Sequence, residues 1–306
     1  MNNDKIPQDT YETFYIETDL QNSFQSHNQL CKLAYELQNT SSPAVLIDLS
    51  NANFIAANLF PVLGSIFSNY NHKVQHDGII RIKGLTKSML DTAQKNGFAT
   101  CFGMKKTLDT KNKVIPYKRF PVNNIDEYER YLTLNLFTRT DLPRMSQEVS
   151  DSIRDYLLEL FKNVKDHTTS NSIFTCGQYF SKSCMLFFTI VDIGETIPYN
   201  VINYHKTNNL PIPEFTLEWA LTSGNSTIIG NTPRGIGFTL IKEFVNLNSG
   251  CFYIVSKDET YEINRQKERF LKLDYPFPGT FVTVGFNLRD DAVYFLESET
   301  NNTIQF

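Results

Sequence analysis

The order of the hydrophobic patterns in the second half of the chain restricts the fold more than any other feature of the sequence. The pattern predicts a helix at 146–165, strands at 172–180 and 185–192, a polar segment at 194–234, a helix at 235–247, and strands at 251–256 and 279–286. Helices and strands in this order predict an α+β layer fold. A polar segment of roughly forty residues inside a compact domain is typical of a lid over a functional site.

Short strands and helices alternate in the first third of the chain. The predicted elements are strands at 44–49 and 78–83 and helices at 56–69 and 86–95. This β-α-β-α alternation predicts a small α/β domain over residues 1–108. Residues 109–145 are predicted to be a linker, with a loop at 111–116 and a connecting helix at 126–136. Residues 146–306 then form the second domain.

Composition limits the classes of function. The formal net charge is −4 and the sequence pI is about 5.8, so a broad basic surface for nucleic acid is not indicated. The apolar run 185–191 is far too short to cross a bilayer, and residues 1–10 lack the apolar core of a signal peptide. Five cysteines without a CxxC pair and five histidines without metal-ligand spacing argue for reduced thiols and against zinc. We therefore expect a cytoplasmic protein without a membrane segment.

Three polar residues recur at every fourth position along the helix predicted after residue 145. Glu159, Asn163 and His167 are thereby stacked on one side of that helix. An asparagine carbonyl oxygen is a suitable ligand for Mg²⁺, and a glutamate can accept a proton from water or from a hydroxyl group. A histidine can donate a hydrogen bond to a phosphate. An ordinary solvated helix face has the same spacing, so the row alone does not decide the function.

A carboxylate ends the second predicted strand of this half. Asp192 follows the apolar run 185–191, and a carboxylate at the end of a buried strand needs a partner to offset its desolvation. An adenine amino group is one such partner. Gly194 would let a ligand approach the backbone closely. The same two residues are also found in ordinary Asp-x-Gly turns.

Glycines open the helix predicted at 235–247. Free backbone N–H groups at Gly235 and Gly237 are suited to bind phosphate, and Arg234 adds a positive charge beside them. In the last predicted strand, Gly279 precedes Thr280, whose hydroxyl group could reach a nucleotide base. Taken singly, each of these pairs is equally compatible with a turn or a plain helix start.

In their order along the chain, these four segments resemble the N box, the G1 box, the G2 box and the terminal Gly-Thr of the GHKL superfamily of ATPases, which includes histidine kinases, gyrases and heat-shock chaperones. The matching residues are Glu159-x-x-x-Asn163-x-x-x-His167, Asp192-x-Gly194, Gly235-x-Gly237 and Gly279-Thr280. Ser226-Thr227 resembles the serine-threonine pair of many lids in that superfamily. The resemblance covers about residues 146–287, nearly half of the chain.

This resemblance implies a two-layer α/β sandwich of the histidine kinase-like ATPase type, which binds ATP and Mg²⁺ beneath a flexible lid. It implies that Asn163 holds Mg²⁺ and that Asp192, helped by Thr280, recognises adenine. It further implies that the phosphates lie under the helix start at Gly235, and that Glu159 is the candidate general base.

The chain departs from the pattern of the superfamily at one position. Thr196 stands where the G1 box usually has a second glycine. A Cβ atom there is expected to narrow the base pocket or to slow the lid, which would affect turnover more than binding.

The first domain resembles, more weakly, the STAS domain of anti-sigma-factor antagonists. Leu46-Ile-Asp-Leu-Ser50 matches the strand of that family, and Phe54-Ile55 matches the phenylalanine that follows it. Ala56-Ala57-Asn58 stands where that family has an aspartate and a phosphorylatable serine. The acceptor serine is missing, so the resemblance implies a docking or dimerising module that is not switched by phosphorylation at this site. A generic small α/β domain is the alternative.

Three uses of ATP stay open at this point. The first is a conformational switch that hydrolyses ATP slowly and signals through a protein partner or through the first domain. The second is a protein serine kinase similar to the anti-sigma-factor kinases, with a separate STAS-domain protein as its partner. The third is a nucleotide-sensing interaction protein without hydrolysis. Residues 117–142 contain no histidine, so a classical autophosphorylating histidine kinase is not expected, and a homodimer is compatible with all three uses.

Overall fold

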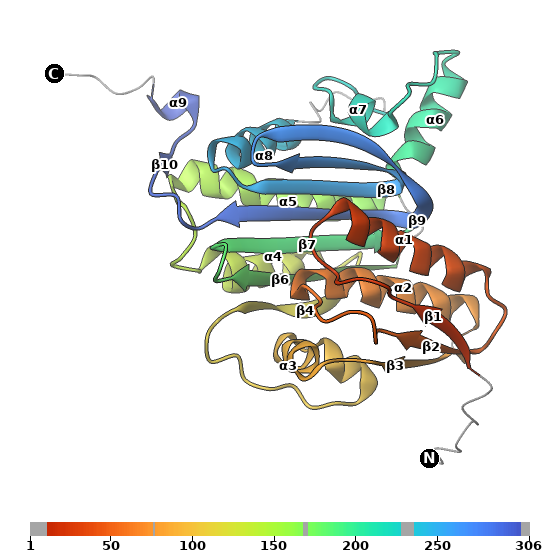
Figure 1. Ribbon diagram of the computed structural model, residues 1–306. Helices are drawn as coiled ribbons and strands as arrows, with labels where there is room; N and C mark the ends of the chain where they lie inside the picture. The colour runs from red at the N-terminus through yellow and green to blue at the C-terminus, as the bar shows by residue number, and fades with distance from the viewer. Residues whose placement is uncertain (1–10, 76, 168–170, 228–235, 301–306) are drawn as a thin grey trace.

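The computed structural model describes residues 11–75, 77–167, 171–227 and 236–300, with the side chains of 165–167, 236, 237 and 300 excluded. The chain is a mixed α/β protein with a three-stranded parallel sheet near the N-terminus and a five-stranded antiparallel sheet towards the C-terminus, both packed against helices (Figure 1). No helix in these ranges is both long and apolar enough to cross a bilayer.

Alternating strands and helices build the amino-terminal part. Its elements are β1 (Glu12–Tyr15), α1 (Phe24–Asn39), β2 (Ala44–Asp48), α2 (Phe60–Lys73), β3 (Ile79–Lys83) and α3 (Lys87–Asn96), with the strand order β1-β2-β3. The strands and helices predicted between residues 44 and 95 are thereby confirmed. Helix α3 begins after Thr86, whose hydroxyl accepts a hydrogen bond from the Met89 amide at 3.2 Å, and it ends at Gly97, whose φ is 95°.

The five-stranded sheet and its helices form the carboxy-terminal part. The strands are β4 (Val114–Pro121), β6 (Ser172–Phe180), β7 (Met185–Ile193), β8 (Cys251–Asn264) and β9 (Lys267–Asn287), in the order β4-β6-β7-β9-β8. The helices are α4 (Ile125–Leu132), α5 (Gln147–His167) and α8 (Ile236–Leu247). A short pair, β5 (Arg144–Met145) with β10 (Val293–Tyr294), and the turn α9 (Glu297–Thr300) complete this part. The helix predicted at 146–165 and the strands predicted at 172–180 and 185–192 are confirmed.

Helices cover both faces of the five-stranded sheet. Alternate residues of β7 divide between two apolar clusters, as a strand of period two requires. Val191 packs in a cluster with residues of α1, α2 and β2, whereas Phe188 and Ile190 pack in a second cluster with residues of α4, α5 and α8. Helices α1 and α2 therefore lie between the two sheets, and α4, α5 and α8 cover the opposite face of the larger sheet (Figure 1). The larger sheet thus connects the amino-terminal part with α5.

The loop predicted at 111–116 is wrong in its second half. Val114 begins strand β4 and pairs with Gln178 of β6, so part of the predicted linker is an edge strand of the large sheet. The turn before this strand is fixed by Asp109, whose carboxylate accepts hydrogen bonds from the amides of Lys113 at 2.5 Å and Val114 at 2.8 Å. The polar composition of this stretch reflects the turn and hides the strand that follows it.

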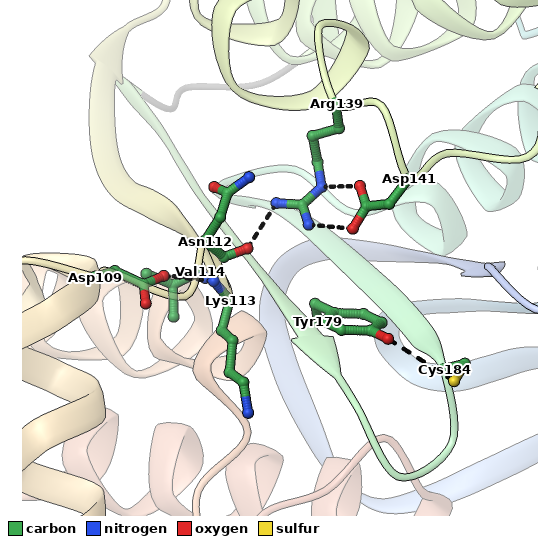
Figure 2. Close-up of polar contacts among 8 residues, drawn as sticks. All are labelled: Asp109, Asn112, Lys113, Val114, Arg139, Asp141, Tyr179 and Cys184. Atoms are coloured by element: carbon green, nitrogen blue, oxygen red, sulfur yellow. Dashed lines mark hydrogen bonds and ion pairs between the residues drawn. The ribbon is translucent and has the colours of Figure 1, made fainter.

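The turn before β4 is also held by Arg139, which follows α4 in the sequence and has a buried side chain. The side chain of Arg139, only 4% exposed, donates a hydrogen bond to the carbonyl of Asn112 at 3.0 Å (Figure 2). It also makes two hydrogen bonds, of 2.9 and 2.7 Å, to the carboxylate of Asp141. At the end of the neighbouring β6–β7 hairpin, the hydroxyl of Tyr179 donates to Sγ of Cys184 at 3.8 Å (Figure 2). The bond from Arg139 to Asn112 joins segments 27 residues apart, whereas the other contacts are local.

The polar segment predicted at 194–234 is not a loop throughout. Two helices, α6 (Ile197–Thr207) and α7 (Thr216–Leu221), form within its described part. Glu259 of β8, only 2% exposed, accepts hydrogen bonds from the amides of Thr216 at 3.1 Å and Leu217 at 2.8 Å. A carboxylate beside the first amides of a helix satisfies donors that have no partner within the helix. Helix α7 is therefore anchored by a residue that follows it by about forty positions.

The last two strands are much longer than predicted. Strands β8 and β9 include the predicted ranges 251–256 and 279–286, and they continue as one hairpin to a turn at Arg265 and Gln266. Both turn residues have positive φ, 49° and 66°, as a two-residue hairpin turn of the primed type requires. The extension carries Glu259 out to α7, so the long hairpin decides where that helix lies.

Candidate functional site

A cavity of about 240 Å³ lies where α5, the end of β7, an interior part of β9, and the helices α6 and α7 meet. Its polar lining includes Glu159 and Asn163 from α5, Asp192 from β7 and Thr280 from β9. Its walls are mainly apolar and include Ile190, Val201, Trp219, Phe238, Ile254 and Val282. A mainly apolar concavity with a few convergent polar groups is the usual form of a small-molecule site. Four residues proposed from three separate segments of the sequence therefore lie around one cavity.

The carboxyl group of Asp192 is the most unusual polar group in this cavity. The residue is 5% exposed, and burial raises the pKa of its carboxyl group to about 8. The amides of Asp192 and Thr280 donate hydrogen bonds to the carboxylate and oppose this shift. Its other oxygen, Oδ2, has no hydrogen-bond partner among the described residues. A buried acceptor without a partner is costly, so this oxygen is available to a donor on a ligand.

Helix α5 brings two of its polar residues to the same cavity. Glu159 and Asn163 are one turn apart and both line it, as their spacing predicts. His167, the third member of the row, is the last residue of α5, and its side chain lies outside the described part of the structure. Its proposed contact with phosphate stays a prediction.

A buried hydroxyl network connects β9 with the start of α6. The hydroxyl oxygens of Thr280 and Ser256 are 2.8 Å apart, and the amide of Ile197 donates to the hydroxyl of Ser256 at 2.9 Å. Ser256 is fully buried, and Ile197 also lines the cavity. A ligand that displaced Thr280 would therefore act on the first turn of α6 through the side chain of Ser256 alone.

Gly279 is required by the packing of the sheet. A Cβ atom there would lie 2.1 Å from the carbonyl oxygen of Asp192 and 2.8 Å from Cα of Ile193. The close approach of β7 and β9 thus brings the backbone of Thr280 against Asp192. The Gly-Thr pair has a structural role at this position whether or not its hydroxyl meets a ligand.

Gly194 and Thr196 line a neighbouring, more open cavity instead of the candidate site. Gly194 donates a backbone hydrogen bond to the carbonyl of Pro278 at 3.0 Å. Thr196 has extended backbone and caps α6, because its hydroxyl accepts a hydrogen bond from the Tyr199 amide at 3.2 Å. The position where the superfamily has a glycine is therefore a helix cap in this chain.

The phosphate side of the predicted site is only partly described. Gly237 lies in the first turn of α8, and the next residue, Phe238, lines the cavity. Arg234 and Gly235 lie outside the described residues. Ser226 and Thr227, compared above with the lid pair of the superfamily, both line the cavity.

Several lining residues were missed by the sequence analysis because they lie on α6 and α7. They are Ile197, Asn200, Val201, Trp219, Ala220 and Leu221. The signals in the sequence were Trp219, the only tryptophan of the chain, and apolar residues spaced four apart within this segment, such as Ile197 with Val201 and Leu217 with Leu221. The ring of Trp219 contacts His205 edge-on, with centroids 4.9 Å apart, and an aromatic contact of this kind indicates packing against a helix.

Acidic side chains gather in the described lining of the cavity. Glu159, Asp192 and Glu195 bring carboxyl groups to it, and the described lining contains no lysine or arginine. Within the described ranges, no three histidine, cysteine, aspartate or glutamate side chains cluster as a metal site. An anion could therefore bind there only together with a cation. The anion itself would supply some of the ligands of that cation.

No family model matches the chain, and neither curated proteins nor solved structures give a match. The function must therefore be inferred from the geometry of the cavity together with the resemblance in sequence.

Proposed function

We propose that this cavity binds ATP with Mg²⁺ and that the protein is an ATP-driven conformational switch of the GHKL type, which hydrolyses ATP slowly. One observation carries the proposal. The unpartnered Oδ2 of Asp192 lies in the same cavity as Asn163 and Thr280, three residues that were assigned to one nucleotide site from separate segments of the sequence. The antiparallel sheet with α4, α5 and α8 on one face supports the proposed two-layer sandwich.

The adenine end of the site fits the residues present. Asp192 would accept a hydrogen bond from the exocyclic amino group, which would satisfy its free oxygen. Ile190, Ile254 and Val282 come from three adjacent strands and would pack on the base. The mainly apolar wall thus suits a flat, weakly polar ring with one donor.

The phosphate end fits a magnesium complex better than a free nucleotide. Asn163 would offer its carbonyl oxygen to the metal ion. When bound, Mg²⁺ supplies positive charge that offsets the repulsion between phosphates and the carboxylates of the lining. Glu159, one turn from Asn163, would accept a proton from a water molecule in the same cavity.

The switch is proposed because β7 contacts both the cavity and the amino-terminal part. Asp192 faces the cavity, whereas Thr189 faces the opposite side, where its hydroxyl accepts a hydrogen bond from Nδ2 of Asn58 at 3.0 Å. Asn58 lies in the stretch Ala56-Ala57-Asn58, which stands where the STAS-like interpretation expects an aspartate and a phosphorylatable serine. We propose that the amino-terminal part, as a STAS-like docking module, transmits the nucleotide state to a protein partner. Helices α6 and α7, which line one side of the cavity, are the proposed moving cover.

Adding MgATP is expected to change the fluorescence of Trp219, which is the only tryptophan and lines the cavity. Removing Mg²⁺ with a chelator should weaken ATP binding by roughly tenfold or more, because the described lining supplies carboxylates and no cation. The titration is followed by emission on excitation at the red edge, where tyrosine does not absorb, and is repeated by calorimetry.

The control for this titration is Asn163→Ala, which should bind ATP with little dependence on Mg²⁺. Absence of both a fluorescence change and binding heat with MgATP would contradict the proposed site. Equal binding of ATP and GTP would contradict adenine recognition by Asp192, because the 6-oxo group of guanine offers no donor at that position.

Replacing Glu159 by glutamine is expected to lower phosphate release from MgATP about 100-fold or more, while ATP binding changes less than threefold. The substitution keeps the shape of the side chain and removes the group that accepts the proton. Phosphate release is measured under single-turnover conditions beside the Trp219 titration.

Glu148→Gln is the matched control for this substitution, because Glu148 lies in the first turn of α5 and is exposed. Equal phosphate release by Glu159→Gln and the unmodified protein would exclude Glu159 as the base. Transfer of labelled phosphate to a separate STAS-domain protein would replace the switch by the serine kinase. Tight binding with neither hydrolysis nor transfer would leave nucleotide sensing as the function.

A further inference from the structure

A second, apolar cavity of about 270 Å³ lies in the amino-terminal part, away from the proposed nucleotide site. It is bordered by β2, β3, α2 and α3, and by the 3₁₀ turn Phe98–Phe102 that follows α3. Its lining is almost entirely apolar, with Phe102 and Met104 partly exposed at its rim. Protein interiors are close-packed, so an open apolar space of this size is unusual in a core. Its volume lies just below the range of about 300–1,000 Å³ found for small-molecule pockets.

Strand β3, which borders this cavity, is an edge strand, and β2 is its only partner among the described strands. The amide of Ile79 donates to the carbonyl of Pro43, and the carbonyl of Lys83 accepts from the Leu49 amide, both at 2.8–2.9 Å. The backbone groups of successive residues alternate between the two sides of a strand. Ile80 and Ile82 therefore direct their N–H and C=O groups away from β2, and those groups have no backbone partner in the described chain.

We propose that the free edge of β3 and the adjoining apolar cavity together bind an extended segment of a partner protein, which adds to the sheet as a fourth strand. The unpaired backbone groups of Ile80 and Ile82 would hydrogen-bond to the segment. Alternate side chains of an added strand lie on the same face of the sheet as Ile80 and Ile82, where the cavity accepts them.

Charge on this edge indicates an acidic partner segment. Arg81 and Lys83 are exposed and alternate along β3 with Ile80 and Ile82, and Arg81 also borders the cavity. Lys83 pairs with Asp48 at 2.9 Å, whereas Arg81 packs over the ring of Tyr11 at 4.7 Å and has no carboxylate partner in the described residues. Pairing of β3 with β3 of a second copy would bring these like charges together, which is unfavourable. The partner therefore carries apolar and acidic residues in alternation.

The test uses the full-length protein and a fluorescein-labelled heptapeptide that alternates glutamate and leucine, with blocked ends. The peptide should bind, and it should slow hydrogen exchange of the Ile80 and Ile82 amides while the Ile79 amide, already bonded to Pro43, changes little. A peptide N-methylated at its leucines and another N-methylated at its glutamates should differ in affinity for the protein, because only one of the two sets of amides faces β3. A peptide with lysine in place of glutamate should bind roughly tenfold more weakly or not at all.

Two variants check the protein side of the interface. Ala93→Phe fills the cavity from α3 and should weaken peptide binding at least about tenfold, while MgATP binding remains unchanged. Arg81→Glu should reverse the preference between the acidic and the basic peptide. No binding at millimolar peptide, binding without protection of Ile80 and Ile82, or equal effects of the two N-methylated peptides would overturn the proposal. A dimer of the free protein that protects the same amides would also overturn it.

Discussion

Replacing Asp192 by asparagine is expected to weaken ATP binding at least about 100-fold and at the same time to stabilise the fold at neutral pH. Hydrogen bonds from the backbone of Asp192 and Thr280 favour the ionised carboxylate, and Oδ2 has no partner among the described residues. We therefore infer that these bonds reach the other oxygen. The single oxygen of asparagine would keep the backbone donors, so its NH₂ group would take the place of Oδ2. A donor would then face the donor of adenine, and the hydrogen bond would become a repulsive contact.

The stabilisation follows from the burial of this carboxyl group. Its pKa is raised by burial from 3.8 to about 8, so protonation is favoured in the folded state. The stability that such a group contributes is fully present below the pKa that it has in the unfolded chain. This contribution is lost as pH rises through the pKa that the group has in the folded protein. At pH 7 the folded protein keeps Asp192 mostly protonated, whereas the unfolded chain ionises it. This difference costs stability on the order of 4 kcal/mol, and a neutral amide removes most of that cost.

Thermal unfolding and ATP titration of the same samples test this prediction. The exposed Glu195 also lines the cavity, and Glu195→Gln is the control that removes a carboxylate without a buried free oxygen. The asparagine variant should gain relative preference for a 6-oxo purine nucleotide over ATP. Loss of stability together with undiminished ATP binding would show that Asp192 neither carries the buried free oxygen nor contacts the ligand.

A second large effect is expected at His27, which lies between α1 and the large sheet. The side chain is fully buried, and its ring lies edge-on to Tyr253 at 5.4 Å and Phe281 at 5.3 Å. Neither ring nitrogen has a hydrogen-bond partner among the described residues. Replacing His27 by leucine should therefore raise the free energy of unfolding by about 1–3 kcal/mol at pH 7.

Burial also makes this histidine a source of acid sensitivity. It lowers the pKa of His27 from 6.5 to about 4, so the imidazole stays neutral in the folded state. Stability from this group is present above pH 6.5 and is lost as pH falls through 4. The loss across this window is about 3 kcal/mol.

Between pH 4 and 6.5, a rise in pH increases the contribution of His27 to the free energy of unfolding and decreases that of Asp192. The two slopes against pH therefore cancel in this range. In the unmodified protein, the summed effect of the two groups on the free energy of unfolding should therefore change little between pH 4 and 6.5. Between pH 6.5 and 8 the free energy of unfolding should decline. His27→Leu should lose stability continuously as pH rises from about 4 to 8. Asp192→Asn should gain stability from pH 4 to 6.5 and then remain level.

Urea unfolding at several pH values separates these contributions, and the double variant should remove both slopes. The exposed His72 supplies the control substitution His72→Gln, which removes an imidazole from the surface and none from the core. If the curve of His27→Leu runs parallel to that of the unmodified protein between pH 4 and 6.5, the buried imidazole does not control acid stability.

Local patterns predicted the elements whose apolar residues lie on one side. Helix α5 and strands β6 and β7 follow their predicted ranges closely, because each buries a face that its own residues define. The placement of Glu159 and Asn163 on one side of α5 follows from the same helical period. The burial of Asp192 follows from its place at the end of an apolar strand.

Tertiary contacts decided the remaining features. Strand β4 forms because Asp109 and Arg139 fix the turn before it and β6 pairs with it, and α7 begins where Glu259 of β8 supplies acceptors. The contribution of α6 and α7 to the cavity, and the packing of α1 and α2 on the large sheet, likewise depend on residues far apart in the sequence.

The sequence by itself determined which segments become helices and strands wherever one face is apolar, and it determined the chemical groups available to the cavity. Only the tertiary structure decided that Thr196 caps a helix and that, among the described residues, an oxygen of Asp192 has no partner and β3 has a free edge. The physical reason is that periodicity acts through neighbours within a few residues. The partner of a buried polar group, in contrast, is chosen by which distant segments the core brings together.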